Sequence, residues 1–191
     1  QPKMFFSSLA IWCGLLILVW YSFGQTIGEA IGFDLSEKEQ VIGLGHFITS
    51  EFLWFDTFFA FGTIAFFLVW RSRSPHEWQI WSVLGSALLI YLSYASVQVS
   101  VVINAWYGPF YNDVQTALGG NGEISASDLY GHILVFCIIV FPYIIFVPFK
   151  FFFTSHYIFR WRNAMNDFYT SKWEKVRGIE GASQRVQEDT M

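Results

Sequence analysis

Four long apolar stretches constrain this chain more than any other feature of its sequence. A helix needs roughly 20 apolar residues to cross the hydrocarbon core of a bilayer. Four stretches meet or nearly meet that length: Met4 to Phe23, Phe52 to Trp70, Ile80 to Ile103 and Leu129 to Phe153. The composition agrees, because only 14% of the residues are charged, against about 25% in soluble domains. We therefore predict an all-α, polytopic transmembrane protein with four spans.

The basic residues gather on one side of the predicted spans. Lys3 precedes the first span, Arg71 and Arg73 follow the second, and seven more lie from Lys150 onward. Lys38 is the exception, so ten of the eleven basic residues share one side. Short cytoplasmic loops carry an excess of Lys and Arg. We therefore predict that both termini are cytoplasmic, which is an N-in, C-in topology.

The two segments predicted to face outward carry helix signals of their own. Ser36 to Glu39 has the S-x-x-E capping form, which predicts a short interfacial helix after it. In the second segment, residues 110–118 follow Pro109 and precede Gly119 and Gly120. A proline at the start and glycines at the end are helix start and stop signals, so we expect a second short, separate helix there.

The sequence divides into a transmembrane region, residues 1–154, and a polar cytoplasmic extension, residues 155–191. Ser125 and Asp128 are expected to cap the helix of the fourth span. We expect this helix to continue through Arg177, because the extension contains no proline. At 1.5 Å per residue, the part from Ser155 to Arg177 would extend about 35 Å beyond the membrane. The chain stops at Met191 without a capping signal, so we expect the extension to be truncated.

The third predicted span carries polar residues on two faces. Five serines fall within about 40 degrees of one line at 100 degrees per residue; they are Ser82, Ser86, Ser93, Ser96 and Ser100. Such a stripe of small residues favours close helix packing, and the alternative is the wall of a polar cavity. Gln98 lies about 160 degrees away, beside Tyr91 and Tyr94. Polarity on both faces indicates that this span lies inside a bundle or beside a wet cavity.

Three ionisable residues lie within or near the ends of the spans. Asp56 lies about one turn inside the outer end of the second span, and Glu51 lies at its boundary. Ionisable groups at membrane depth are candidates for function, so Asp56 could carry a proton, although a group this near the interface could also simply be solvated. His132, near the outer end of the fourth span, has an intrinsic pKa suited to a proton relay, and its alternative role is structural.

No motif of a soluble enzyme occurs in the sequence. It contains no G-x-x-x-x-G-K-[ST], H-E-x-x-H, C-x-x-C or G-x-S-x-G pattern. Cys13 and Cys137 both lie in apolar runs, and no metal-ligand spacing is present. We therefore expect no enzymatic activity, no metal, no cofactor and no nucleic-acid partner.

Four runs of sequence together resemble a known family. They are Ser74 to Ser82, Asn104 to Tyr111, Ser155 to Asn166 and Ile179 to Thr190. They closely resemble the SbmA/BacA family of bacterial inner-membrane peptide transporters, and the likeness runs from about Ser50 to the end. The resemblance implies the N-terminal half of an ABC-exporter-like membrane domain without an ATPase.

The function that this resemblance implies is uptake of peptides and peptide-like antibiotics from the periplasm by a homodimer, driven by the proton gradient. The runs around Arg160 and Gln184 also look like the membrane domain of fatty-acyl ABC transporters. The alternative is therefore the membrane domain of an ATP-driven transporter of acyl or corrinoid-like substrates, with its ATPase outside this chain.

The resemblance and the polar pattern together suggest three groups of site residues. The proton-coupling candidates are Glu51, Asp56, Glu188 and Asp189. The substrate-cavity candidates are Gln98, Asn104, Tyr107, Tyr111 and Asn112. A cytoplasmic structural motif comprises Arg160, Trp161, Arg162, Gln184 and Arg185. Gln98 stands where we expect the family to have Glu, so proton coupling through that position is in doubt.

The topology predicts how the end of the chain is labelled. A tag on Met191 should be unreactive toward a membrane-impermeant reagent in intact cells and should react once the inner membrane is permeabilised, since the basic extension is expected to be cytoplasmic. Labelling from outside an intact cell would overturn the topology and the import assignment with it.

Overall fold

The computed structural model describes residues 2–36, 41–120, 124–179 and 181–190. Its elements are α1 (Pro2–Ile31), the 3₁₀ helix η1 (Leu44–Ile48), α2 (Ser50–Arg73), the π-helical segment η2 (Ile80–Gly85), α3 (Ser86–Gly119), α4 (Ala126–Val176) and α5 (Ala182–Thr190). The described residues contain no strand, and α1 to α4 are each long and apolar enough to cross a membrane. The all-α polytopic class predicted from the sequence is confirmed.

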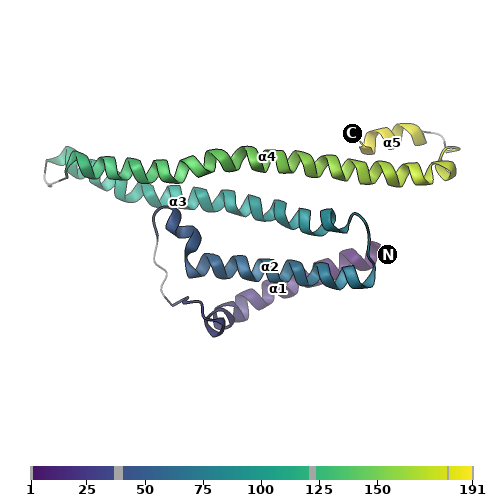
Figure 1. The fold of residues 1–191 in the computed structure, drawn as a ribbon, viewed down its shortest axis with the longest axis horizontal. Coiled ribbons are helices and arrows are strands. Elements are labelled where there is room, and N and C mark those ends of the chain that lie inside the picture. Colours follow the sequence, from purple (N-terminus) through teal and green to yellow (C-terminus); the bar gives the residue numbers. More distant parts are fainter. Residues whose placement is uncertain (1, 37–40, 121–123, 180, 191) are drawn as a thin grey trace.

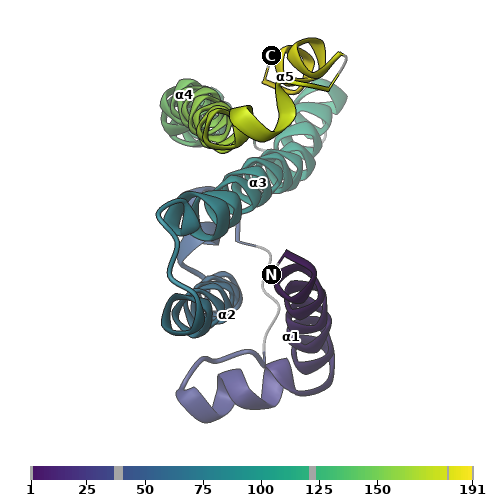
Figure 2. The same ribbon diagram turned by 90° about the vertical axis from the view of Figure 1, so that its right-hand side faces the viewer.

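The long helices alternate in direction (Figure 1). The N-terminus, the α2 to α3 connection and the end of α4 lie at one end of the molecule, while the other connections lie at the opposite end. Seen along the helices, α3 lies between α4 on one side and α2 with α1 on the other (Figure 2). This arrangement agrees with the expectation that the third span lies inside a bundle.

The short helix predicted after Pro109 is not separate, and that prediction was wrong. The structure continues α3 through Pro109 to Gly119. Proline removes one backbone donor and crowds the preceding turn, but neighbouring helices allow membrane helices to tolerate it. Here the rings of Trp106 and Phe110 stack on each other, with centroids 4.6 Å apart, and both pack in the cluster between α3 and α4. The stop signal is correct, since Gly120 has φ 67°, which favours glycine.

The sequence also predicted the starts of two other helices, from motifs at Ser36 and Ser125. The Ser125 side chain and the Asp128 side chain form the capping box of α4 as expected. The Ser36 to Glu39 motif extends into residues 37–40, which lie outside the described residues. The short element beyond it is the 3₁₀ helix η1.

The fourth span and the extension form one helix of 51 residues, which is about 76 Å long at 1.5 Å per residue. Pro142 and Pro148 lie inside α4 without ending it. The helix ends at Val176, and α5 turns back alongside its end after Gly181, which has φ 78° (Figure 1).

Three tryptophans join α1 to α2. The indole N–H of Trp12 donates to the Gly62 carbonyl, that of Trp54 donates to the Gly24 carbonyl, and that of Trp70 donates to the Ser8 hydroxyl, each at 3.0 Å. The two helices approach closely at Gly62, where an added Cβ would lie 2.7 Å from a methyl group of Leu16. Each indole therefore combines ring packing with a hydrogen bond that suits an apolar surrounding.

The contact between α3 and α4 has a buried core. Val102, Trp106 and Ile139 are at most 6% exposed, and the Trp106 indole donates to the His132 carbonyl at 2.8 Å.

Because of this core, substitutions at neighbouring residues should differ greatly in their effect on the free energy of unfolding. Trp106→Ala should destabilise the α3 to α4 contact by about 3–5 kcal/mol, because it removes a large buried ring. Tyr107→Ala is the matched control, since Tyr107 is 43% exposed and should change the free energy of unfolding far less. Unfolding in mixed micelles, followed by circular dichroism, measures both, and equal losses would contradict the assigned core.

Candidate functional site

The face of α3 toward α4 carries two serines that bond across the contact. Ser86 Oγ and Tyr157 Oη are 2.7 Å apart, and Lys150 Nζ donates to Ser96 Oγ at 3.0 Å. These bonds agree with helix packing as the role of this part of the serine stripe. Ser93 and Ser100 instead donate to carbonyls of their own helix and are exposed.

The face of α3 toward α2 and η1 carries two different polar pairs. Tyr91 Oη donates to Asp56 Oδ2 at 2.9 Å. Gln98 Oε1 and His46 Nε2 are 2.9 Å apart. Between these pairs, the Tyr94 ring packs on Phe55 with centroids 4.4 Å apart. The two faces of α3 are thus polar because each contacts another helical element, as the two-sided pattern indicated.

A third face of α3 is polar and exposed. At 100 degrees per residue, an arc of about 80 degrees contains the exposed apolar Val97 and Leu118 and six exposed polar residues; the six are Ser93, Ser100, Asn104, Tyr107, Tyr111 and Gln115. We call this set the open α3 face. The Tyr107 and Tyr111 rings stack with centroids 5.6 Å apart and are 43% and 52% exposed. Hydroxyls and amides are costly against lipid, so a surface of this kind suits a water-filled cavity.

Four of the five substrate-cavity candidates lie on or beside the open α3 face. Asn104, Tyr107 and Tyr111 belong to it, and the exposed Asn112 lies at its edge. Gln98 does not belong to it, because it lies half-buried against His46. The structure therefore separates Gln98 from the other four.

Asp56 is the proton-coupling candidate with a defined setting. One carboxylate oxygen accepts the Tyr91 hydroxyl. The other, Oδ1, is buried and has no hydrogen-bond partner among the described residues. A buried polar atom without a partner is costly, so Asp56 is suited to taking up a proton or a cationic group at Oδ1.

The other proton-coupling candidates lie apart from Asp56. Glu51 is exposed in the first turn of α2, whereas Glu188 is exposed on α5, at the far end of α4 (Figure 1). The side chain of Asp189 lies outside the described residues. The structure does not bring these carboxylates together with Asp56.

Of the structural motif that was predicted to be cytoplasmic, Arg160 contacts another element. Its guanidinium lies 5.3 Å from the ring centroid of Trp81, and its Nε donates to His156 Nε2 at 3.4 Å. A guanidinium over an aromatic face is attracted by the ring quadrupole. Arg160 thus ties α4 to η2, while Trp161, Arg162, Gln184 and Arg185 are exposed.

His132 pairs with Asp113, with Nε2 and Oδ2 2.7 Å apart. This contact connects the outer parts of α3 and α4 and agrees with the structural role considered for His132. Among the residues that the structure describes, no group of three His, Cys, Asp or Glu side chains is placed to hold a metal ion.

Three polar partners were missed from the sequence: His46, Lys150 and Asp113. His46 lies in the connection between α1 and α2, where helical periodicity makes no prediction. Lys150 and Asp113 lie on helices. Antiparallel pairing of α3 with α4 would have placed Lys150 near Ser96 and Asp113 near His132. That signal requires the register of the two helices, which the sequence alone does not give.

These features define a multi-pass α-helical membrane protein whose central helix carries a set of exposed polar side chains. Comparison with known protein families identifies the group. The model of the SbmA/BacA-like family matches residues 75–191, which is more than half of the chain. The chain belongs to the SbmA/BacA-like family, and this membership indicates a membrane transporter.

The Asp56 to Tyr91 contact predicts a measurable coupling. In a double-mutant cycle of Asp56→Asn and Tyr91→Phe, the interaction energy should be about 1 kcal/mol, as for other hydrogen bonds between membrane helices. Unfolding in mixed micelles measures the free energies. The control cycle pairs Asp56→Asn with Tyr107→Phe, on the open α3 face, and should be additive within about 0.5 kcal/mol. Equal coupling in both cycles would contradict a direct contact.

Proposed function

We propose that this protein imports peptides and peptide-like antibiotics across the bacterial inner membrane, as a homodimer driven by the proton gradient. Membership of the SbmA/BacA-like family supports transport. The observation that carries the proposal for the substrate is the open α3 face, because exposed amides and hydroxyls along one side of a membrane helix are suited to the wall or mouth of a water-filled path.

The chemistry of the open α3 face suits peptides of many sequences. Asn104 and Gln115 offer amides that match a peptide backbone, while the stacked rings of Tyr107 and Tyr111 offer apolar surface with a polar edge. Tyrosine supplies both kinds of contact with little loss of side-chain freedom. Scattered contacts of this kind favour a broad substrate class over a single tightly bound ligand.

The proposed energy source requires a carboxylate whose proton affinity differs between the inward-open and outward-open states. Asp56 is the strongest candidate among Glu51, Asp56, Glu188 and Asp189, because it lies between α2 and α3 with one oxygen buried and unpartnered among the described residues. Gln98 cannot titrate, and its amide contacts His46. Movement of α2 against α3 would change the surroundings of Asp56.

The proposed homodimer supplies the rest of the cavity wall. The open α3 face lies on one side of a single chain, so it needs a facing surface to enclose a substrate. In an ABC-exporter-like arrangement, long helices of two copies cross and enclose a common cavity, and the continuous 51-residue α4 has the length for such a helix.

Peptide uptake into proteoliposomes tests the proposal. The protein expressed from the complete reading frame should accumulate a labelled peptide under an imposed inward proton gradient, and a protonophore should abolish the accumulation. Asp56→Asn should remove most of the gradient-dependent uptake, because an amide cannot titrate. Tyr111→Ala should lower uptake under every condition. Asp34→Asn is the matched control, since Asp34 is exposed outside the helices and, among the described residues, is hydrogen-bonded to its neighbour Ser36.

Three outcomes would contradict the proposal. Uptake that requires ATP in place of the gradient would favour the ATP-driven alternative for acyl or corrinoid-like substrates. Unchanged coupling in Asp56→Asn would remove Asp56 from the proton path. The absence of peptide movement under any gradient would contradict transport of peptides.

A further inference from the structure

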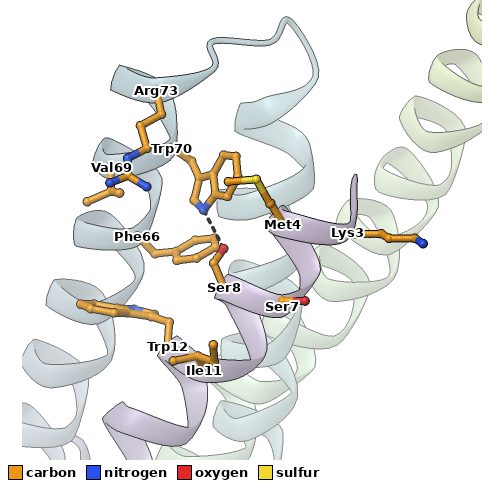
Figure 3. A pocket seen from close by; sticks show the side chains of 10 residues that line it. All are labelled: Lys3, Met4, Ser7, Ser8, Ile11, Trp12, Phe66, Val69, Trp70 and Arg73. Atoms are coloured by element: carbon orange, nitrogen blue, oxygen red, sulfur yellow. Dashed lines mark hydrogen bonds between the residues drawn. The ribbon is translucent and has the colours of Figure 1, made fainter. Parts of the chain in front are cut away.

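A groove lies between the first half of α1 and the second half of α2, away from the open α3 face (Figure 3). Its volume is about 450 Å³. Its floor and walls are mainly apolar and include Ile11, Trp12, Phe66 and Trp70. The proposed transport function makes no use of this groove.

The polar atoms of the groove's tryptophans are already bound within the protein. The Trp70 indole donates to Ser8 Oγ (Figure 3), and the Trp12 indole donates to the Gly62 carbonyl. Phe66 and Trp70 are held in place, being 6% and 9% exposed. The groove therefore presents ring and aliphatic surface to an occupant, which suits a hydrocarbon chain.

The charged residues that line the groove are all basic. Lys3 on α1 and Arg73 in the last turn of α2 are among its lining residues, and no acidic residue lines it. Neither cation has a carboxylate partner in the described part of the chain. In Figure 3 the Arg73 side chain lies along α2, while the exposed Lys3 side chain extends from α1 and points away from the other lining residues. The complementary occupant carries an anionic group beside an apolar chain.

The groove has the length and position of one membrane leaflet. From Lys3 to Trp12, α1 rises about 14 Å at 1.5 Å per residue, and half of the hydrocarbon core is about 15 Å. Its two cations lie at the end of the molecule where α1 begins and α2 ends (Figure 1). Basic pockets between membrane helices on the cytoplasmic side are typical sites for anionic lipid head groups.

We propose that this groove binds one anionic glycerophospholipid of the cytoplasmic leaflet. The phosphate lies at Arg73, Lys3 on the facing turn of α1 adds a second positive charge at the same end of the groove, and one acyl chain lies along the groove over Trp12 and Phe66. The lipid thereby adds to the contact that Trp12 and Trp70 already make between α1 and α2. The site is independent of the transport proposal and remains if that proposal fails.

Native mass spectrometry of the purified, delipidated protein tests the site. Dioleoylphosphatidylglycerol should bind as one tight adduct per chain, and dioleoylphosphatidylcholine should bind more weakly. Lys3→Gln and Arg73→Gln should each weaken phosphatidylglycerol binding about fivefold, the effect expected for one basic residue near an anionic lipid. Arg71→Gln is the matched control, because Arg71 lies in the last turn of the same helix but does not line the groove.

A second variant tests the acyl chain separately from the charge. Ile11 is 69% exposed, so Ile11→Trp should fold and fill the groove, and it should weaken binding of both lipids. Equal binding of the two lipids by the wild type, or an equal loss in Arg71→Gln and Arg73→Gln, would overturn the site. So would efficient disulfide formation between Ile11→Cys residues of two copies in a Cys13→Ser background, because a second copy would then occupy the groove.

Discussion

Polar groups inside a bilayer have to be satisfied by the protein, and the arrangement of these helices follows from that constraint. Trp12, Trp54 and Trp70 join α1 to α2 through their indole N–H groups. Tyr91 joins α2 to α3 through Asp56, and Lys150 joins α3 to α4 through Ser96. Each contact between neighbouring helices therefore includes at least one hydrogen bond that water could not easily replace at that depth.

The central position of α3 explains why its polar residues have three different roles. The face toward α4 and the face toward α2 use their polar groups within the protein, whereas the open α3 face leaves Asn104, Tyr107 and Tyr111 exposed. The same face also carries the exposed Val97 and Leu118. The polar residues of α3 are thus divided between contacts with helices on two sides and an exposed surface on the third.

Hydropathy and capping patterns predicted the four spans, the capping box at Ser125 and the continuation of the fourth helix well beyond its span, because these depend on local sequence. Local sequence failed at Pro109, where packing of Trp106 and Phe110 keeps the helix intact. It also failed to pair Gln98 with His46, since that contact depends on how the connection after α1 returns to the bundle. The sequence identified the types of residue that make up the candidate site. Assigning them to three faces of α3 required the register of the helices.

The two prolines of α4 give this long helix a defined point of flexure. Pro142 and Pro148 each remove a backbone hydrogen bond, and sharp helix bends concentrate at proline. The part from Pro148 to Val176 is about 42 Å long, so a bend of about 10 degrees there would carry its tip through about 7 Å. A small change in the angle of α4 at these prolines would therefore move its end at Val176 much further than the residues beside the prolines.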